Sequence, residues 1–380
     1  MNFKSLMGLA IALLMFPQIA QTLYSPALSD IGLVFAVKPP VAAQMLSVFF
    51  LAFAVGVVVW GRLCDRLGRR PTMLAGLTLY AAATVLGLTA SEFEVLLLAQ
   101  VIAAFGASVG SIVTQTVLRD RYSGPELAHV FSLVGIALAA SPALGLFAGA
   151  SLVQLFGYRG VLAGLLLLAC VLWLWCLWAL PETRRTHQEI APLLGTLCLM
   201  LKDLALWRAA VLVSAFNVAL FSFYSLGPFM FERAGLTTQA FGYSGVLLAL
   251  GSGLGAALNT YWLRRGVGGT TLVTTASALM LLGAVLVWLL ESRAWFVLPM
   301  LLVVLAFGMA IPNVLSTALM AYQDRLGTAG ALFGLIYYLI IGAALVWVAW
   351  GQALGITLLI CASIALVLSC WRREQHSSSH

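Results

Sequence analysis

A short polar segment at residues 61–71 carries the densest set of side chains that can form ion pairs. It reads Gly-Arg-Leu-Cys-Asp-Arg-Leu-Gly-Arg-Arg-Pro, so four arginines surround a single acid, Asp65. Arginine pairs strongly with carboxylates at helix ends, and glycine lets two backbones approach closely. The segment is therefore a candidate latch that holds one conformation of the molecule.

Polar and aromatic side chains also recur inside long apolar segments, where each must face other protein groups or a wet cavity. The candidates for a substrate cavity are Gln18, Gln21, Tyr24, Gln100, Asn217, Phe221, Tyr224, Asn313 and Tyr337. Neutral hydrogen bonds and aromatic faces suit an uncharged or zwitterionic organic molecule better than a bare ion. For any one residue, a hydrogen bond between helices is the alternative use.

Residue patterns for catalysis are missing from the sequence. The six cysteines are scattered without paired spacing, which predicts neither a disulfide nor a metal site. No cluster of His, Asp, Glu or Cys falls within an apolar segment, and no phosphate-binding loop is present. We expect no enzyme activity, metal or cofactor.

These side chains are carried by a very apolar chain, with 62% hydrophobic residues, 9% charged residues and a mean hydropathy of +1.05. Crossing the hydrocarbon core takes about 20 apolar residues. The pattern predicts an all-α polytopic membrane protein with twelve transmembrane helices, at residues 5–27, 41–61, 72–90, 94–118, 129–154, 160–180, 207–231, 240–263, 271–290, 294–318, 328–350 and 353–371.

The basic residues orient the predicted helices, because Lys and Arg accumulate in cytoplasmic loops. Four of the twenty, namely Lys38, Arg159, Arg233 and Arg293, fall on one side of the membrane and the others on the opposite side. We therefore expect both termini to be cytoplasmic. This distribution accounts for the net charge of +7 without nucleic acid.

The spans divide into two groups of six. We expect an N-terminal half at 1–180, a cytoplasmic linker at 181–206, a C-terminal half at 207–371 and a cytoplasmic tail at 372–380. An apolar stripe at 193, 194, 197, 200, 201 and 204 predicts an amphipathic helix in the linker. The second and eighth spans end similarly, which suggests two pseudo-symmetric halves.

The segment at 61–71 matches the pattern G-x-L-x-D-R-x-G-R-R and thereby resembles the signature loop of the major facilitator superfamily. The resemblance implies alternating access, with this loop clamping the two halves on the cytoplasmic side. It makes Asp65 the anchor of the latch, Gly61 its close-packing residue, and Arg66 and Arg69 its cations. The whole latch set is Gly61, Asp65, Arg66, Gly68, Arg69 and Asp120.

Four further segments resemble the Bcr/CflA drug-resistance group within that superfamily. They run over most of the first half, and the second half is matched chiefly by its pattern of helices. The segments are Leu-Tyr-Ser-Pro-Ala-Leu at 23–28, Val-Leu-Arg-Asp-Arg-Tyr at 117–122, Ser-Pro-Ala-Leu-Gly at 141–145 and Pro-Glu-Thr-Arg at 181–184.

The fifth span resembles the antiporter motif of exporters, with Gly135, Pro142, Gly145 and Gly149 as its helix-kink residues. Proline bends a helix, and small residues nearby let another helix pack against the bend. The second proline of the family pattern is Leu146 here. Ordinary transmembrane packing is the alternative interpretation.

Two charged residues of the family pattern are absent, since the family's Asp in span one corresponds to Thr22 and its Arg in span four to Gln100. All thirteen acids lie in loops or near helix ends, although proton-coupled carriers use an acid that titrates during the cycle. The remaining proton-coupling candidates are Asp30 and Glu232. For each, a solvated or interfacial acid is the alternative.

Taken with the resemblance, the sequence predicts a functional monomer in the bacterial inner membrane. It would export a small organic solute, a drug or metabolite, by alternating access, with a proton gradient as the energy source. An importer or facilitator of a neutral metabolite such as a nucleoside is the second hypothesis. A membrane-embedded enzyme or receptor is a third, which the residues do not support.

Overall fold

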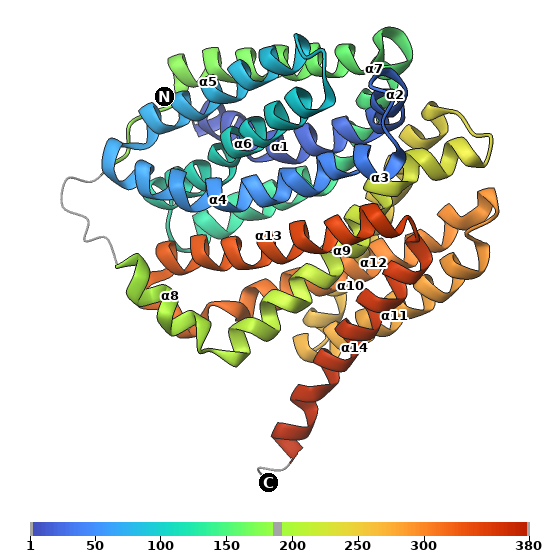
Figure 1. Ribbon diagram of the computed structural model, residues 1–380. Helices are drawn as coiled ribbons and strands as arrows, with labels where there is room; N and C mark the ends of the chain where they lie inside the picture. Colours follow the sequence, from blue (N-terminus) through green and yellow to red (C-terminus); the bar gives the residue numbers. More distant parts are fainter. Residues whose placement is uncertain (1–2, 185–191, 378–380) are drawn as a thin grey trace.

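The computed structural model describes residues 3–184 and 192–377, and these residues are helical with short connections and no β-strand (Figure 1). Part of the predicted linker, residues 185–191, and the last three residues of the predicted tail lie outside the described residues. The long helices cross the molecule in two groups. An all-helical architecture is what the apolar segments predicted.

The helices differ in length, and most are longer than the apolar segments that predicted them. In chain order they are α1 (Phe3–Tyr24), η1 (Ser25–Ala27), α2 (Leu28–Val34), α3 (Pro39–Ala42), α4 (Gln44–Leu67), α5 (Arg69–Leu88), α6 (Phe93–Arg121), α7 (Gly124–Ala179), α8 (Leu193–Leu201), α9 (Leu204–Arg233), α10 (Thr238–Arg264), α11 (Gly269–Leu290), η2 (Ala294–Phe296), α12 (Val297–Ala318), η3 (Met320–Arg325), α13 (Leu326–Gly351) and α14 (Leu354–Ser377).

These helices provide the twelve predicted spans. Ten stretches among the described residues are long and apolar enough to cross a membrane. One of them, His129–Ala179, contains two spans, and Leu354–Cys370 supplies a shorter apolar helix at the end of the chain. The predicted fold class is confirmed.

The fifth and sixth spans meet without a loop, because α7 runs through both and breaks at Gly157. Gly157 has φ 65° and ψ −166°, a backbone conformation that glycine adopts far more readily than other residues. We expected a connection between 154 and 160. A single glycine makes the reversal instead, and the carboxylate of Asp30 accepts a hydrogen bond from the N–H of Tyr158 at 2.7 Å.

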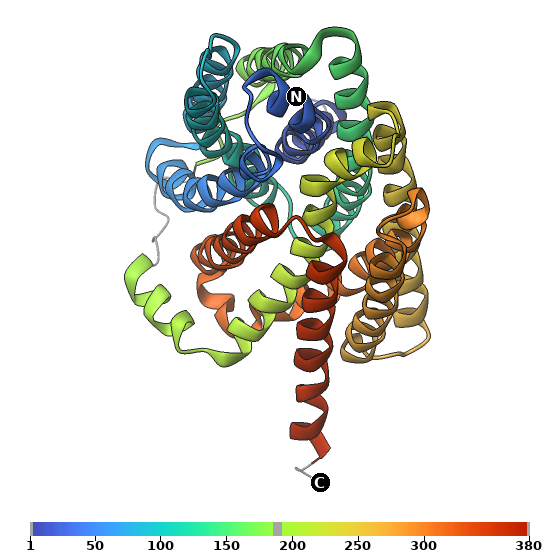
Figure 2. The same cartoon turned by 45° about the vertical axis from the view of Figure 1, so that its right-hand side comes forward.

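The two groups of six spans each have a buried apolar core, one built mainly from α1–α7 and the other from α9–α14. Figures 1 and 2 show the first group above the second, with the last turns of α14 extending away from the bundle. Each group buries its own side chains. The fold therefore has the two halves that the repeated pattern suggested.

The halves meet chiefly along two helix pairs, α4 with α13 and α7 with α10, and also where η1 and α2 contact α9; we call this whole contact between the halves the seam. Small residues keep the seam tight, since a Cβ added at Gly342 would lie 2.7 Å from the Leu51 side chain. One added at Gly245 would lie 2.8 Å from Leu146. Glycine is used here for close helix packing.

The short helix α8 follows the gap in the described residues and lies beside α13 and α9. Its Thr196 and Met200 are buried, whereas Leu194 is exposed. The predicted apolar stripe extended to 204, but Asp203 accepts hydrogen bonds from the N–H groups of Ala205 and Leu206. This cap starts α9 at Leu204, so that the stripe is divided between two helices.

Candidate functional site

The signature loop joins α4 to α5, and a buried ion pair holds it in place. Nε of Arg69 lies 2.7 Å from Oδ2 of Asp120, at the end of α6, and the Arg69 side chain is only 1% exposed. The carboxylate of Asp65 lies 3.9 Å from the same guanidinium and is 35% exposed. Asp120 is therefore the closer and better-buried partner of Arg69.

A second acid, Glu182, reaches the same loop from the chain that leaves α7. Its carboxylate accepts hydrogen bonds from the backbone N–H groups of Arg69 at 3.0 Å and Arg70 at 3.2 Å. The next residue, Thr183, donates from its hydroxyl to Oδ2 of Asp120 at 2.8 Å. The loop, the end of α6 and the chain after α7 thus form one network.

The environment of Glu182 favours the ionised carboxylate. Partial burial by itself raises the pKa, but the backbone N–H groups of Arg69, Arg184 and Arg70 donate to the carboxylate and lower its pKa below the ordinary value. These N–H groups include two unsatisfied donors at the start of α5, where a negative charge is favourable. Glu182 therefore caps α5.

Two features of position 68 favour glycine over any other residue. Its φ is 105°, and a Cβ added there would lie 2.5 Å from Oε2 of Glu182. Of the other residues in the predicted latch, Gly61 lies beside Ile112 and Arg66 is exposed. The structure places Gly68, Arg69 and Asp120 in the buried network and Arg66 at its surface.

The two halves are joined near the end of the bundle opposite the signature loop, where α1 and α9 meet. The hydroxyl of Ser25 donates to the carbonyl oxygen of Tyr224 in the other half. Gln21 lies one turn before Ser25 on the same face of α1, and its side chain is 4% exposed. Gln18, a further turn away, is partly exposed.

Aromatic rings cross the seam beside this contact. Phe50 of α4 lies 4.6 Å from Phe221 of α9 and 6.0 Å from Tyr338 of α13, measured between ring centroids. Phe53, also of α4, lies 5.0 Å from Tyr338. We call Phe50, Phe53, Phe221 and Tyr338 the aromatic cluster.

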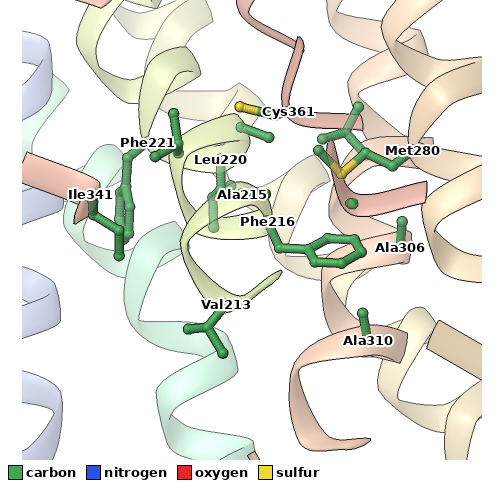
Figure 3. Packing of buried hydrophobic residues seen from close by; sticks show 14 of the residues in the cluster. Val213, Ala215, Phe216, Leu220, Phe221, Met280, Ala306, Ala310, Ile341 and Cys361 are labelled. Carbon is green, nitrogen blue, oxygen red and sulfur yellow. The ribbon is translucent and has the colours of Figure 1, made fainter. Parts of the chain in front are cut away.

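Two faces of α9 serve different purposes. Figure 3 shows Phe216 directed toward Ala306 and Met280 in the core of its own half, and Phe221 on the other side of the helix near Ile341 of α13. Phe221 thus belongs to the seam and Phe216 does not. Neighbouring apolar residues on α9 therefore divide between a structural core and the candidate site.

Some predicted cavity residues lie inside one half. Tyr24 and Gln100 line a cavity of about 10 Å³ together with Tyr80 and Thr84, within the first half. Such a space holds roughly one water molecule. These residues contribute the few polar groups of a small, mostly apolar pocket that is separate from the aromatic cluster.

Three other predicted cavity residues engage in contacts within the second half. The side-chain amide of Asn313 donates to Oδ1 of Asn259 at 2.6 Å, and Asn217 donates to the carbonyl oxygen of Val213 at 2.8 Å. The backbone oxygen of Tyr337 accepts from Ser214 at 3.2 Å, while the Tyr337 ring lies 4.3 Å from that of Tyr338. Tyr337 thereby adjoins the aromatic cluster.

The helix-kink residues of α7 divide into two environments. Gly145 packs directly on the Thr22 side chain of α1, and Gly149 packs on the backbone of Leu23. Gly135 has open space where a Cβ would be, and Pro142 is partly exposed. The small residues near the middle of α7 thus fit it closely against α1.

The two proton-coupling candidates lie at the end of the bundle away from the signature loop. Asp30 caps the sixth span through the N–H of Tyr158, as described above. Glu232 is exposed at the end of α9. In the described residues, no group of three or more His, Cys, Asp or Glu side chains forms a metal site.

This same end of the bundle is closed between the halves. Residues 218–231 of α9 and 20–28 of α1, η1 and α2 are all buried. Gln44 donates to the carbonyl oxygen of Val346 at 3.4 Å, and Gln239 donates to the side chain of Gln154, so both pairs bridge the halves. Toward the signature loop, α1 has partly exposed residues, among them Gln18.

The sequence did not single out Phe50, Phe53, Asn259 or Glu182. The two Phe residues lie in an apolar run, Leu-Ser-Val-Phe-Phe-Leu-Ala-Phe, which by itself resembles any buried span. Glu182 contacts residues more than a hundred positions away, which no local spacing reveals. Its place in the Pro-Glu-Thr-Arg segment was the available signal.

Comparisons with known proteins agree with this architecture. The family model described as Major Facilitator Superfamily matches residues 8–346. The chain is 30% identical over 354 residues to the chloramphenicol resistance protein of Pseudomonas aeruginosa, covering 87% of this chain and 82% of the relative. It is 27% identical over 340 residues to multidrug resistance protein D of Escherichia coli strain K12, covering 87% and 84%.

Among solved structures, the xylose transporter of Escherichia coli in an inward open conformation superposes with a TM-score of 0.77 at 12% identity, covering 97% of this chain and 95% of that one. The likeness concerns the fold. Since the Major Facilitator Superfamily model covers most of the sequence, this chain is a transporter and not an enzyme, and transporters of that family need no cofactor. The chain belongs to the major facilitator superfamily.

Proposed function

We propose that this transporter exports a small organic solute, a drug or metabolite, by alternating access between its two halves. The observation that carries the proposal is the seam, where buried polar and aromatic side chains from both halves meet beside Ser25 and Tyr224. A solute held there contacts both halves and can pass from one side to the other when they rock.

The outward direction of transport is supported by the relatives. The two described above are a chloramphenicol resistance protein and a multidrug resistance protein, and a third, from Haemophilus influenzae, is a bicyclomycin resistance protein homolog. Resistance by a carrier requires removal of the compound from the cell. We extend that direction to this chain and place it in the bacterial inner membrane as a functional monomer.

The signature loop faces the cytoplasm in this proposal, as do both termini. Arg62, Arg66, Arg69 and Arg70 lie at this end, and the positive-inside preference supports that orientation. The closed end of the bundle then faces outward. In this proposal, the latch network around Arg69 stabilises particular conformations of the cytoplasmic end during the transport cycle.

Proton antiport is the proposed energy source, with Asp30 and Glu232 as the acids that exchange protons. Both lie at the outer end, in contact with the side from which protons enter the cell. The N–H of Tyr158 donates to the carboxylate of Asp30, and this hydrogen bond links Asp30 to the break in α7 at Gly157. Protonation of Asp30 would therefore act on the packing of two spans.

A facilitator or importer of a neutral metabolite such as a nucleoside is the second candidate function. A specific observation favours it, because the middle of α1, α4, α9 and α13 contains no Asp, Glu, Lys or Arg. Without a central charge, the solute can move without an accompanying proton. The two candidates differ in direction and in their dependence on a proton gradient.

Flux in everted membrane vesicles separates them. Vesicles with and without the protein are supplied with radiolabelled chloramphenicol or uridine, in the presence and absence of a proton gradient. Export predicts gradient-dependent accumulation of chloramphenicol that a protonophore abolishes. Equilibration of uridine without a gradient would support the facilitator, and equal flux in vesicles lacking the protein for both compounds would contradict transport of either.

A further inference from the structure

Buried polar atoms without partners occur on α4 and α9, which carry rings of the aromatic cluster, and on α1. In the described part of the chain, five buried side-chain polar atoms have no hydrogen-bond partner, and three of them, Nε2 of Gln21, Oγ of Ser47 and Oγ of Ser225, lie on α1, α4 and α9. Buried polar groups in proteins are normally paired. Three exceptions on three helices of one region therefore point to a ligand that pairs with them.

Their positions follow from helical spacing. Ser47 lies three residues before Phe50 on α4, and Ser225 lies four residues after Phe221 on α9, so each shares a helix face with a ring of the cluster. Gln21 lies four residues before Ser25, which is bonded to Tyr224. The three residues therefore lie on helices that meet where the halves join, and two of them share a helix face with a ring of the aromatic cluster.

The surroundings contain no charge that could compensate a charged ligand. The central parts of α1, α4, α9 and α13 have no Asp, Glu, Lys or Arg, as residues 5–29, 39–61, 209–231 and 326–351 show. A bare charge within the membrane is unfavourable unless an opposite charge or water meets it. An uncharged ligand carries no such cost.

The arrangement of the rings in the aromatic cluster indicates the shape of the solute that fits there. Phe50 and Tyr338 are stacked, with 22° between their ring planes, while Phe50 and Phe221 meet across the seam at 53°. An aromatic solute that separates the halves can replace the contact between Phe50 and Phe221 with contacts of the same type. The apolar surface that separation would expose is then covered.

On these grounds we propose that Gln21 and the aromatic cluster select uncharged aromatic solutes that carry a hydrogen-bond acceptor. The ring of the solute enters between Phe50 and Phe221, and its acceptor oxygen receives a hydrogen bond from Nε2 of Gln21. Ser47 and Ser225 supply further hydroxyl groups. This inference rests on the proposed function, because it assigns the substrate class of the same seam.

Ligand-observed NMR on the purified full chain in detergent micelles tests the selection directly. Saturation transfer is measured for benzamide, benzylammonium and benzoate, which share a ring and differ in charge, with empty micelles as the background. We expect saturable binding of benzamide and affinities lower by at least about tenfold for the two ions. Equal or tighter binding of either ion, or no saturable binding of benzamide, would overturn the proposal.

Variants of Gln21 test the donor. In Gln21→Leu and Gln21→Met, the loss of the amide is expected to raise the Kd of benzamide about tenfold. Gln115→Leu is the matched control, since the Gln115 amide already donates to Ser111 at 3.3 Å and its variant is expected to retain the affinity. Unchanged benzamide affinity in both folded Gln21 variants would refute the role of Gln21.

The outcome is separable from that of the proposed function. Binding in micelles does not depend on the direction of transport or on its energy source, whereas the vesicle assay measures both. If the transporter shows flux in vesicles but the Gln21 variants bind benzamide as tightly as the wild type, this inference fails and the proposed function stands. Selective benzamide binding without flux in vesicles defeats the transport proposal and leaves the selection in place.

Discussion

Nε of Arg69 lies 2.7 Å from Oδ2 of Asp120, and this pair joins the start of α5 to the end of α6. The guanidinium is almost completely buried and also donates to the carbonyl oxygen of Cys64 at 3.2 Å. A buried guanidinium is stable only when an acidic side chain compensates its charge.

Asp120→Ala is expected to destabilise the protein by about 3 kcal/mol, because it leaves a buried cation without its nearest counter-charge. Asp65→Ala is the control and is expected to cost less than about 1 kcal/mol, since Asp65 is more distant and more exposed. Thermal unfolding in detergent measures both. A loss for Asp65→Ala that equals or exceeds that for Asp120→Ala would contradict this ranking.

Gly145→Ala is expected to weaken the packing of α7 on α1, because the added methyl group collides with Thr22. The expected cost is about 1–3 kcal/mol. Gly135→Ala on the same helix is the matched control, because open space lies where its methyl group would be. Adding Thr22→Ala to Gly145→Ala removes the nearest colliding atom and is expected to recover part of the loss of melting temperature.

The contribution of Glu182 to stability is expected to depend on pH. Its pKa in the folded protein is below the ordinary value of about 4.3, so the contribution is complete above that value and is lost as the pH falls through the folded pKa. The difference in melting temperature between the wild type and Glu182→Gln should therefore be largest above the ordinary pKa of about 4.3 and shrink as the pH falls through the lower folded pKa.

Glu94→Gln, at an exposed acid, is the control for that measurement. Its difference from the wild type is expected to be small throughout. If the difference for Glu182→Gln increased as the pH fell, the capping role of the ionised carboxylate would be disproved.

Gln154 and Gln239 are in contact across the seam, at the closed end of the bundle. In a background without the six native cysteines, cysteines at these two positions joined by a short bifunctional thiol reagent should hold that end closed. Transport in vesicles is then expected to stop and to return when a cleavable reagent is reduced. Each single-cysteine variant should be insensitive, and undiminished flux in the cross-linked protein would show that this end need not open.

Asp30 has a structural contact that can be separated from a role in proton coupling. Asp30→Asn retains an acceptor for the N–H of Tyr158, whereas Asp30→Ala loses the cap and should cost about 1 kcal/mol. If Asp30 and Glu232 carry the coupled protons, the Asp30→Asn, Glu232→Gln variant should remain folded but lose substrate-driven proton movement. Proton movement that survives in this variant would remove both acids from the coupling mechanism.

The sequence predicted the spans well because the bilayer imposes a simple requirement, a long apolar helix, at every crossing. It missed the form of the connection between the fifth and sixth spans. There, one glycine and a cap from Asp30, far away in the chain, replace a loop. The residues Leu-Phe-Gly-Tyr-Arg at 155–159 gave no sign that a loop was unnecessary.

The candidate site was predictable only where a helix carries an unusual residue. Gln21 and Tyr224 were evident because polar groups are rare in spans, but Phe50 was indistinguishable from the apolar residues around it. Asn313 met the same criterion as Gln21, yet it pairs with Asn259 inside one half. Only the arrangement of helices separates a residue at the seam from one that holds neighbouring helices together.

Glu182 and Thr183 lie where the chain leaves the first half, and both are bonded to the signature-loop network. The covalent connection between the halves thus starts from an anchored point. A movement of the chain at Glu182 and Thr183 would therefore act directly on the start of α5 and the end of α6, the two helix ends that position the signature loop.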